Sequence, residues 1–256
     1  KIEGKGFFTK ELEEALLDEK IDLAVHSHKD LETCPPNGLT VAAVSYRESA
    51  NDILLIRKEN TDIREKFALK KNAVVGTSSA RRKTQLLHFR NDIQLKDLRG
   101  NVPTRIKKLQ EGNYDAILLA KAGTDRLNID LSEFHVEILD ERIFIPAPAQ
   151  GVLALQVREK DKELIKLLQK LNHEDVKKCI SAERKLLNLF DGGCQLPLGA
   201  YCKEDNGKFH FWASVAKNVQ SPVKRIYLQS ETETGLAEKA KKIIDSKNSS
   251  RVFISR

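Results

Sequence analysis

A polar cluster that follows a short apolar run is the first candidate for chemistry in this chain. The six residues 25–30 read VHSHKD and combine histidine, serine, lysine and aspartate. The run before them, residues 21–25, predicts a short buried strand. Ligands of open α/β sheets bind outside the carboxyl ends of the strands, which is where Lys29 and Asp30 would lie. The alternative is a polar exit from a strand whose charges are simply solvated.

Arginines at a predicted helix start form the second candidate. Residues 74–82 (VVGTSSARR) predict a strand ending at a glycine, then hydroxyl side chains, then a helix that opens with Arg81 and Arg82. Free backbone N–H groups and the positive helix end favour anions there. Guanidinium groups add bidentate binding of carboxylate or phosphate. An ordinary capped helix with solvated arginines is the alternative.

The same pattern recurs further along the chain. In residues 98–105 (LRGNVPTR), Asn101 is suited to cap a helix, Arg99 precedes that helix, and Arg105 lies in its first turns. Arg126 lies at a further strand-to-helix junction. Cations at the positive end of a helix are unfavourable unless an anion is bound there. The recurrence therefore favours an anion site.

Cys194 is the third candidate, as a reactive thiol. It stands in residues 191–199 (DGGCQLPLG), after two glycines and shortly before a proline, so we expect a flexible and exposed loop. Cys179, by contrast, falls within a predicted helix. An incidental loop cysteine is the alternative interpretation.

Composition narrows the class of protein. With 256 residues, 40% of them hydrophobic, the chain is long enough for two or three domains with separate cores. No apolar run reaches the ~18 residues of a membrane span, and no signal peptide opens the chain. The net charge of +7 favours an anionic partner. Nucleic acid is disfavoured because the arginines lie at strand-to-helix turns and not along one helix face.

Cysteine usage and chain patterning complete the expectations. The cysteines form no CxxC pair and no zinc spacing, so we expect free thiols and a cytoplasmic protein. Residues 46–51 and 143–151 are expected to cross between domains. We expect strands at 41–44, 53–56, 114–120, 152–157, 209–216 and 226–229, and helices at 161–171, 174–190 and 235–244.

Six motifs taken together resemble the porphobilinogen deaminase (hydroxymethylbilane synthase) family. They occur in the family's order over about residues 3–202 and read GKGFFTKELEEALL, DLAVHSHKDL, VVGTSSARRKTQL, LRGNVPTRIKKLQEGNYDAILLAKAGTDRL, IPAPAQGVLALQVRE and GGCQLPLGAY. The resemblance implies an α/β fold of three domains. Two would be lobes similar to periplasmic binding proteins, with mixed sheets, and the third a small α+β C-terminal domain. The implied bounds are residues 1–46 with 151–171, residues 47–150, and residues 172–256.

The resemblance also implies a transferase of tetrapyrrole (haem) biosynthesis. Members of the family join four porphobilinogens head to tail on a covalently bound dipyrromethane primer. One ammonia is lost at each step, and water then releases hydroxymethylbilane. We therefore expect porphobilinogen as the partner, dipyrromethane as the cofactor, a cytoplasmic monomer, and no metal, nucleic acid or membrane.

Matching the motifs residue by residue implies roles for the candidate side chains. Cys194 would carry the dipyrromethane through a thioether, and Asp30 would be the catalytic carboxylate. The other residues implied in holding the cofactor are Ser27, Lys29, Ser79, Arg81, Arg82 and Arg105. Those implied in binding substrate are Lys5, Phe8, Arg99, Arg126 and Gln150.

The residue types suit this chemistry independently of the resemblance. Each pyrrole carries two carboxylates, so a growing chain needs many cationic partners. Breaking the aminomethyl C–N bond needs acid assistance and leaves a cationic pyrrole, which a nearby carboxylate such as Asp30 would stabilise. No step requires a metal or a nucleotide, in agreement with the lack of a P-loop or zinc spacing in the sequence.

The chain also departs from the family pattern. The family usually has an apolar residue where His28 stands, often Pro at Glu32, and Gly at Ala149 in the hinge motif. We expect His26 to be a packed or hydrogen-bonded support. The family's first strand and an Arg/Ser-containing segment would precede Lys1, so a fragment of a longer chain is expected.

The closing residues VFISR resemble the first strand of uroporphyrinogen-III synthase, so a bifunctional parent chain is a further expectation. The alternative to a transferase is a non-catalytic two-lobed anion-binding module or an inactive fragment.

Overall fold

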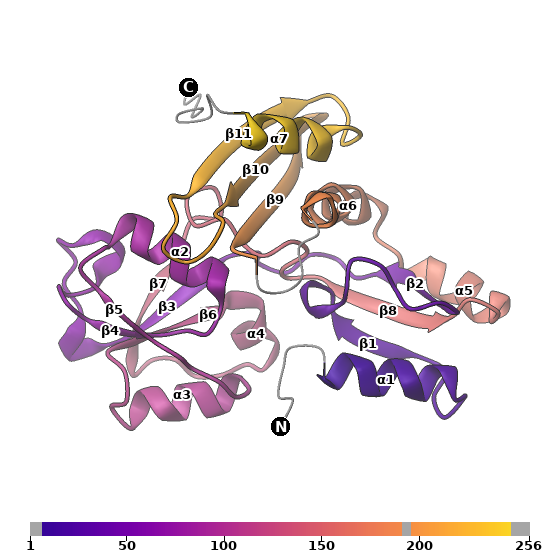
Figure 1. The fold of residues 1–256 in the computed structure, drawn as a ribbon. Helices are drawn as coiled ribbons and strands as arrows, with labels where there is room; N and C mark the ends of the chain where they lie inside the picture. Colours follow the sequence, from indigo (N-terminus) through magenta and orange to yellow (C-terminus); the bar gives the residue numbers. More distant parts are fainter. Residues whose placement is uncertain (1–6, 191–195, 247–256) are drawn as a thin grey trace.

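The computed structural model describes residues 7–190 and 196–246, which form three β-sheets with helices packed on them (Figure 1). No helix within these ranges is long and apolar enough to cross a membrane. The helices are α1 Phe7–Leu17, α2 Ala80–Phe89, α3 Val102–Gln110, α4 Lys121–Arg126, α5 Lys162–Leu168, α6 Glu174–Leu189 and α7 Leu236–Asp245, with short 3-10 turns at η1 His28–Asp30, η2 Lys58–Asn60, η3 Lys66–Ala68 and η4 Gln169–Leu171.

The largest sheet has five strands in the order β5-β4-β6-β3-β7. β4 runs parallel to β5 and β6, whereas β3 is antiparallel to β6 and β7, so the sheet is mixed. Leu54 and Ile56 pack on the side of α2, while Ile53 and Leu55 pack on the side of α3. Burial on both faces explains why β3 is a continuous apolar run. The strands are β3 Asp52–Arg57, β4 Val74–Gly76, β5 Gln94–Lys96, β6 Ala116–Ala120 and β7 Phe134–Ile138.

The first sheet contains β1 Ala24–Ser27, β8 Leu153–Arg158 and β2 Leu39–Val44, in that order and all antiparallel. The predicted strand at residues 21–25 is wrong in its bounds, because β1 starts only at Ala24. The expectation that Val25 is buried is also wrong, since 53% of it is exposed. Strand alternation points Ala24 and His26 inward, which turns Val25 outward.

The third sheet is antiparallel, in the order β11-β10-β9, with α6 and α7 packed on one face. Its strands are β9 Leu198–Asp205, β10 Lys208–Val215 and β11 Lys224–Ser230. The predicted α/β class, with a mixed sheet and a small α+β C-terminal unit, is confirmed.

The chain crosses between the first and second sheets twice, at residues 45–51 and 139–152 (Figure 1). The two crossings are in direct contact, since the Glu48 N–H donates to the Gly151 carbonyl at 3.0 Å. Gly151 has a φ of +90°, and a Cβ there would lie 2.5 Å from the Glu48 carbonyl oxygen. Glycine is therefore required at this position.

Glu183 of α6 joins both crossings to the third sheet. Its side chain is fully buried and forms an ion pair with Arg47 at 2.6 Å. The same carboxylate accepts backbone N–H bonds from Ala149 and Cys202, both at 2.7 Å. One carboxylate thus fixes the relative placement of segments that belong to different sheets.

Replacing Glu183 by Ala should lower the free energy of unfolding by about 3–5 kcal/mol, because it leaves the guanidinium group of Arg47, only 13% exposed, without its carboxylate. Urea unfolding followed by circular dichroism measures this. Glu238→Ala is the control, since the Glu238–Lys185 pair is about half exposed with 4.0 Å between its charged atoms. That variant should lose less than about 1 kcal/mol of its free energy of unfolding. An equally small loss in Glu183→Ala would show that Glu183 does not hold the three segments together.

The turn η1 that follows β1 is held from two sides. The His28 N–H donates to the Val152 carbonyl at 2.9 Å. The Arg184 guanidinium, from α6, donates to the carbonyls of His28 at 2.9 Å and Leu31 at 3.3 Å, and also to that of Glu32. His28 itself is buried, and this burial lowers its pKa to about 3, with Arg184 and His26 acting in the same direction.

The pKa of His28 predicts a loss of stability in mild acid. The unfolded chain takes up a proton on this histidine below about pH 6.5, whereas the folded chain keeps it neutral down to about pH 3, so stability falls as the pH falls through this window. Between pH 7 and pH 5, His28→Leu should reduce this loss by about 2 kcal/mol in urea unfolding. The exposed His173 provides the control variant His173→Leu. The prediction would be refuted if the free energy of unfolding of wild type and of His28→Leu changed with pH by the same amount.

Candidate functional site

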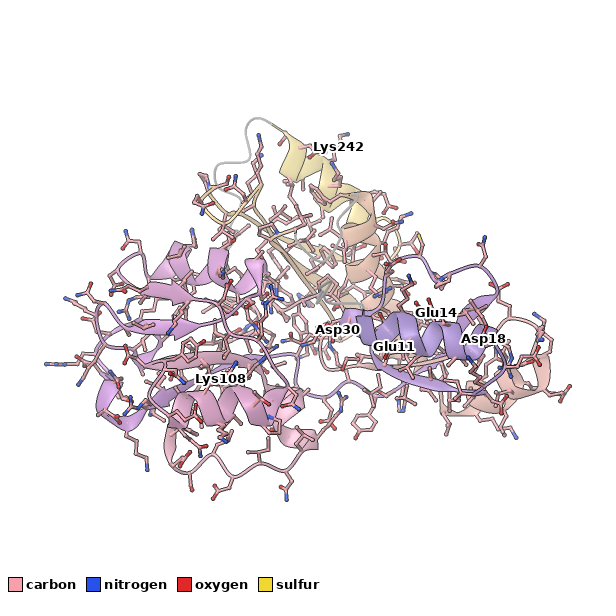
Figure 2. The ribbon with its side chains drawn as sticks, turned by 60° about the horizontal axis from the view of Figure 1, so that its bottom comes forward. Glu11, Glu14, Asp18, Asp30, Lys108 and Lys242 are labelled. Atoms are coloured by element: carbon pink, nitrogen blue, oxygen red, sulfur yellow. The ribbon has the colours of Figure 1, made fainter. Side chains whose placement is uncertain are left out.

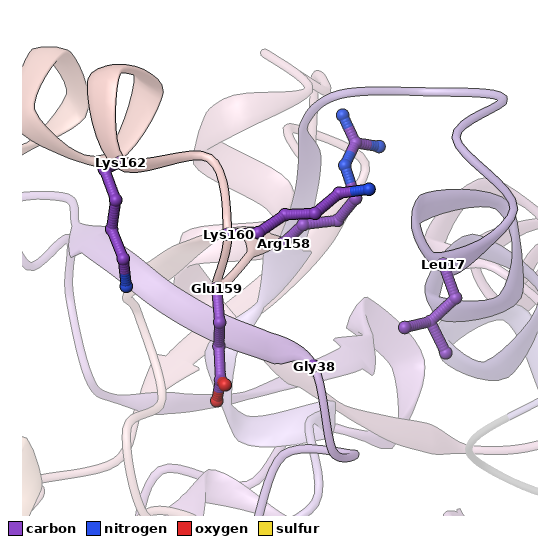
Figure 3. Close-up of a pocket in the computed structure, with 6 residues that line it drawn as sticks. All are labelled: Leu17, Gly38, Arg158, Glu159, Lys160 and Lys162. Carbon is purple, nitrogen blue, oxygen red and sulfur yellow. The ribbon is translucent and has the colours of Figure 1, made fainter.

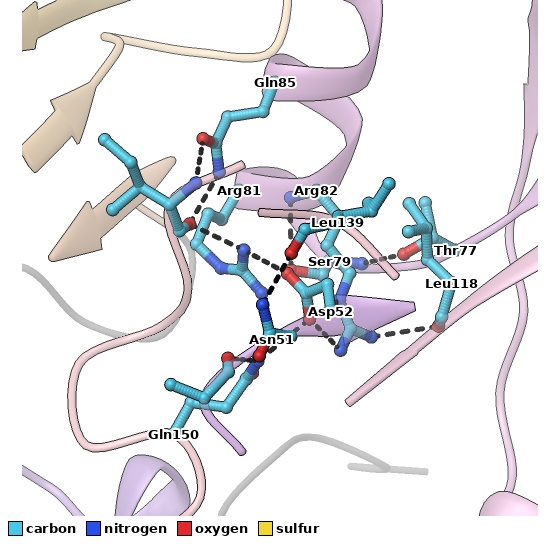
Figure 4. A network of polar contacts seen from close by, with 12 residues as sticks. Asn51, Asp52, Thr77, Ser79, Arg81, Arg82, Gln85, Leu118, Leu139 and Gln150 are labelled. Carbon is cyan, nitrogen blue, oxygen red and sulfur yellow. Dashed lines mark hydrogen bonds and ion pairs between the residues drawn. The ribbon is translucent and has the colours of Figure 1, made fainter. Parts of the chain in front are cut away.

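The start of α2 carries the first part of the site (Figure 4). β4 ends at Gly76, and the following turn brings Ser79 to the N-cap, where its hydroxyl accepts the Arg82 backbone N–H. An N-cap serine satisfies one of the free N–H groups at a helix start. The cap places Arg81 and Arg82 in the first turn, with both side chains directed into the protein and only 6% exposed.

Both guanidinium groups bind one buried carboxylate, that of Asp52 at the start of β3. Arg81 Nη1 lies 2.6 Å from Oδ2, and Arg82 Nη2 lies 2.7 Å from Oδ1. Burial alone would raise the pKa of Asp52, but the charges of Arg81 and Arg82 outweigh it and hold this pKa well below its usual range. Asp52 is a site residue that sequence reasoning missed. Its only sequence signal is an aspartate at the head of a completely apolar run.

Gln150 connects this cluster to the polar turn after β1. Its amide nitrogen donates to Asp52 Oδ1 at 3.0 Å and to the Ala50 carbonyl at 2.7 Å. Its amide oxygen accepts from Lys29 Nζ at 3.4 Å. Gln150 is fully buried in the second crossing, so a continuous polar path joins Lys29 in the first sheet's unit to the arginine pair in the second.

Asp30 lies in the centre of the molecule, between the N-terminal end of α1 and the unit built on the five-stranded sheet (Figure 2). It ends the turn η1 and is half-buried. Arg105 of α3 lies within electrostatic reach of it: burial lowers the pKa of Arg105, the charge of Arg82 lowers it further, and the charge of Asp30 raises it. Asp30, Arg82 and Arg105, which are far apart in sequence, therefore belong to one electrostatic neighbourhood.

The remaining predicted residues lie around this centre. Arg126 is at the last residue of α4, and not at a helix start as expected, and its Nη2 donates to the Gly151 carbonyl at 2.7 Å. Arg99 is exposed and precedes the Asn101 cap of α3. Ser27 is exposed at the end of β1. Phe8 lies in the first turn of α1.

Two of the predicted site residues, Lys5 and the proposed attachment residue Cys194, lie outside the described residues. α6 ends at Leu189 and β9 begins at Leu198, and these elements flank the segment that contains Cys194. The other three cysteines are free thiols, of which Cys34 is exposed and Cys179 and Cys202 are buried.

The arrangement is suited to a ligand with carboxylates. The carboxylates of Asp30 and Asp52 are outnumbered by the cationic side chains described above, which are Lys29, Arg81, Arg82 and Arg105. Arg81 uses only Nη1 for its bonds to Asp52 and the Ile145 carbonyl, and no acceptor for its Nε or Nη2 occurs in the part of the chain that the structure describes. These donors fit the carboxylate side chains of a dipyrromethane. Within the same part, no group of three His, Cys, Asp or Glu side chains could hold a metal ion.

A pocket of about 470 Å³ lies elsewhere, lined by Leu17, Gly38, Arg158, Glu159, Lys160 and Lys162 (Figure 3). It sits at the far end of β8 from Val152 and the turn η1. Arg158 is already paired there with Asp22 at 2.5 Å and Asp161 at 2.7 Å. Its charge is compensated within the protein, so we do not place the functional site there.

The sequence is similar to known proteins over most of its length. Residues 1–166 match the family model for the porphobilinogen deaminase dipyrromethane cofactor binding domain, and residues 177–243 match the model for the porphobilinogen deaminase C-terminal domain. The chain is 44% identical to a porphobilinogen deaminase of Chloroherpeton thalassium over 82% of its own length and 65% of the relative's. It is 38% identical to that of Oceanobacillus iheyensis over 98% of its own length and 80% of the relative's.

Among solved structures, the chain matches an arginine-specific periplasmic binding protein of Salmonella typhimurium at 14% identity and a TM-score of 0.39, covering 68% of this chain and 75% of that one. Since the relatives at 38–44% identity and two family models together cover most of the sequence, the chain belongs to the porphobilinogen deaminase family.

Proposed function

We propose that this chain belongs to a working hydroxymethylbilane synthase, which condenses four porphobilinogens head to tail and releases one ammonia at each step. The observation that carries the proposal is that Arg105 is under the electrostatic influence of both Arg82 and Asp30, although the three residues stand on three separate elements. A carboxylate beside several guanidinium groups suits a substrate that carries carboxylates and becomes cationic during the reaction.

Asp30 is the proposed catalytic residue. In its protonated form the carboxyl group would assist departure of ammonia from the aminomethyl carbon of porphobilinogen. As a carboxylate it would then stabilise the cationic pyrrole that remains and orient the pyrrole N–H. The anchoring of its turn by Arg184 and by the Val152 carbonyl supports this role, since a catalytic group must be held in a fixed direction.

The cationic side chains are the proposed carboxylate receptors. Arg81, with Nε and Nη2 lacking acceptors among the described residues, is the best placed of them. Ser27, Lys29, Ser79, Arg82 and Arg105 are proposed to hold the cofactor, and Lys5, Phe8, Arg99, Arg126 and Gln150 to contact the substrate. When bound through Cys194, the dipyrromethane supplies the terminal pyrrole carbon to which the first substrate is joined.

We further propose that the three sheets mark three domains, with the bounds 1–46 plus 151–171, 47–150 and 172–256. The two crossings and the Glu183 contacts would then be the joints between these domains. A cytoplasmic monomer with porphobilinogen as its partner completes the proposal.

Intact-mass spectrometry of the purified protein tests the proposal. The wild-type protein should carry one covalent dipyrromethane, and Cys194→Ser should carry none, because the thioether needs the sulfur atom. Cys34→Ser is the matched control, since Cys34 is exposed and outside the proposed site. This control should keep the full adduct and convert porphobilinogen at the wild-type rate.

An adduct that persists in Cys194→Ser would refute the attachment residue. Unmodified wild-type protein that binds porphobilinogen without consuming it would instead identify a non-catalytic anion-binding module.

A further inference from the structure

Asp52 holds a position that neither the motifs nor the proposed reaction explains. It is fully buried, and its two oxygens accept hydrogen bonds from Arg81, Arg82 and Gln150 at 2.6–3.1 Å (Figure 4). A carboxylate at the heart of a site for carboxylates would be expected to repel the ligand. The presence of the Asp52 carboxylate in a site for anionic ligands therefore has to be explained.

The reason lies in the burial of the two guanidinium groups. Arg81 and Arg82 are adjacent in the sequence, are each 6% exposed, and bind the same aspartate. Burial lowers the pKa of Arg81, and the charge of Arg82 lowers it too, whereas Asp52 raises it. Two buried cations without a counter-ion would strongly destabilise the fold. One carboxylate compensates only one of the two charges and leaves a net positive site.

The donors that remain point to where a ligand would bind. Asp52 and the Ile145 carbonyl occupy only Nη1 of Arg81, and Asp52 and the Leu118 carbonyl accept from Nε, Nη1 and Nη2 of Arg82. Nε and Nη2 of Arg81 have no acceptor within residues 7–190 and 196–246. A ligand carboxylate can therefore bind Arg81 while Asp52 stays in place.

We propose that Asp52 is a positioning residue, a resident counter-ion that holds Arg81 and Arg82 in their ligand-binding orientation before any anionic ligand arrives. The identity of that ligand as a pyrrole carboxylate rests on the proposed function, whereas the counter-ion role does not. Through Gln150, whose oxygen accepts from Lys29, the same carboxylate also connects the arginine pair to the turn that carries Asp30.

The test uses Asp52→Asn, which keeps the shape and one acceptor oxygen but removes the charge. The matched control is Asp92→Asn in the same unit, where Asp92 binds Arg90 at 2.7 Å and Arg90 is also 6% exposed. Arg90 has additional backbone partners in the Lys66, Leu69 and Lys70 carbonyls and lies outside the site. Asp92→Asn loses one arginine–aspartate pair and Asp52→Asn loses two, and only Asp52→Asn removes the proposed counter-ion of the site.

Thermal unfolding in inorganic phosphate, compared with chloride at equal ionic strength, is the first readout. An anion that binds only the folded state raises its stability. The phosphate-induced rise in Tm should be at least twice as large in Asp52→Asn as in wild type and Asp92→Asn, because phosphate replaces the missing carboxylate. The same rise in all three proteins would overturn the proposal.

Charge compensation is the second readout and does not require Asp52→Asn to be well folded. The double variant Asp52→Asn/Arg81→Gln removes one cation together with the anion, so its Tm should exceed that of Asp52→Asn, or its soluble yield should recover. A double variant no more stable or soluble than Asp52→Asn would overturn the counter-ion role. Neither readout uses the cofactor, so the proposal can fail while the wild-type protein carries dipyrromethane, or succeed while it carries none.

Discussion

Two guanidinium groups that lie side by side inside a protein require a carboxylate, and this constraint organises the centre of the molecule. Asp52 meets it from the first residue of β3, directly after one crossing, and Gln150 joins it from the other crossing. Lys29 reaches the same network from the turn after β1. The arginine pair, both crossings and the turn that carries Asp30 are thus positioned by one set of buried polar contacts, which a substitution at any member would disturb.

The second crossing also carries backbone strain. Ala149 is fully buried and has a φ of +60°, a left-handed conformation that costs a non-glycine residue about 1 kcal/mol or more. Its N–H donates to Glu183, which helps to hold it there. The sequence shows alanine at a position where family members usually have glycine, and the observed φ explains that preference. In this chain the Glu183 contact offsets the conformational cost.

Local sequence patterns predicted most helices and strands but not the long-range side-chain contacts between them. The apolar runs identified β3, β6 and β8, and Asn101 caps α3 as predicted, accepting the Thr104 N–H at 3.0 Å. The predicted strands did not include β5, β7 and β9, although the alternation of apolar and polar side chains in β7 is the pattern of a half-buried strand. The Asp52 and Glu183 clusters join residues that are 19 to 136 positions apart, which no periodicity reveals. The site residues came from motif types and the resemblance, whereas the inward direction of Arg81 and Arg82 required the structure.

We propose that a pyrrole chain grows on this protein under the control of Asp30. Intact-mass spectrometry after addition of a few equivalents of porphobilinogen is the direct test of this growth. We expect the wild-type protein to give a ladder of covalent species, each heavier than the last by one porphobilinogen less one ammonia. We expect Asp30→Asn to give a single species that keeps the primer but gains nothing. A wild-type mass that does not change with porphobilinogen, or a full ladder in Asp30→Asn, would disprove growth of the chain under the control of Asp30.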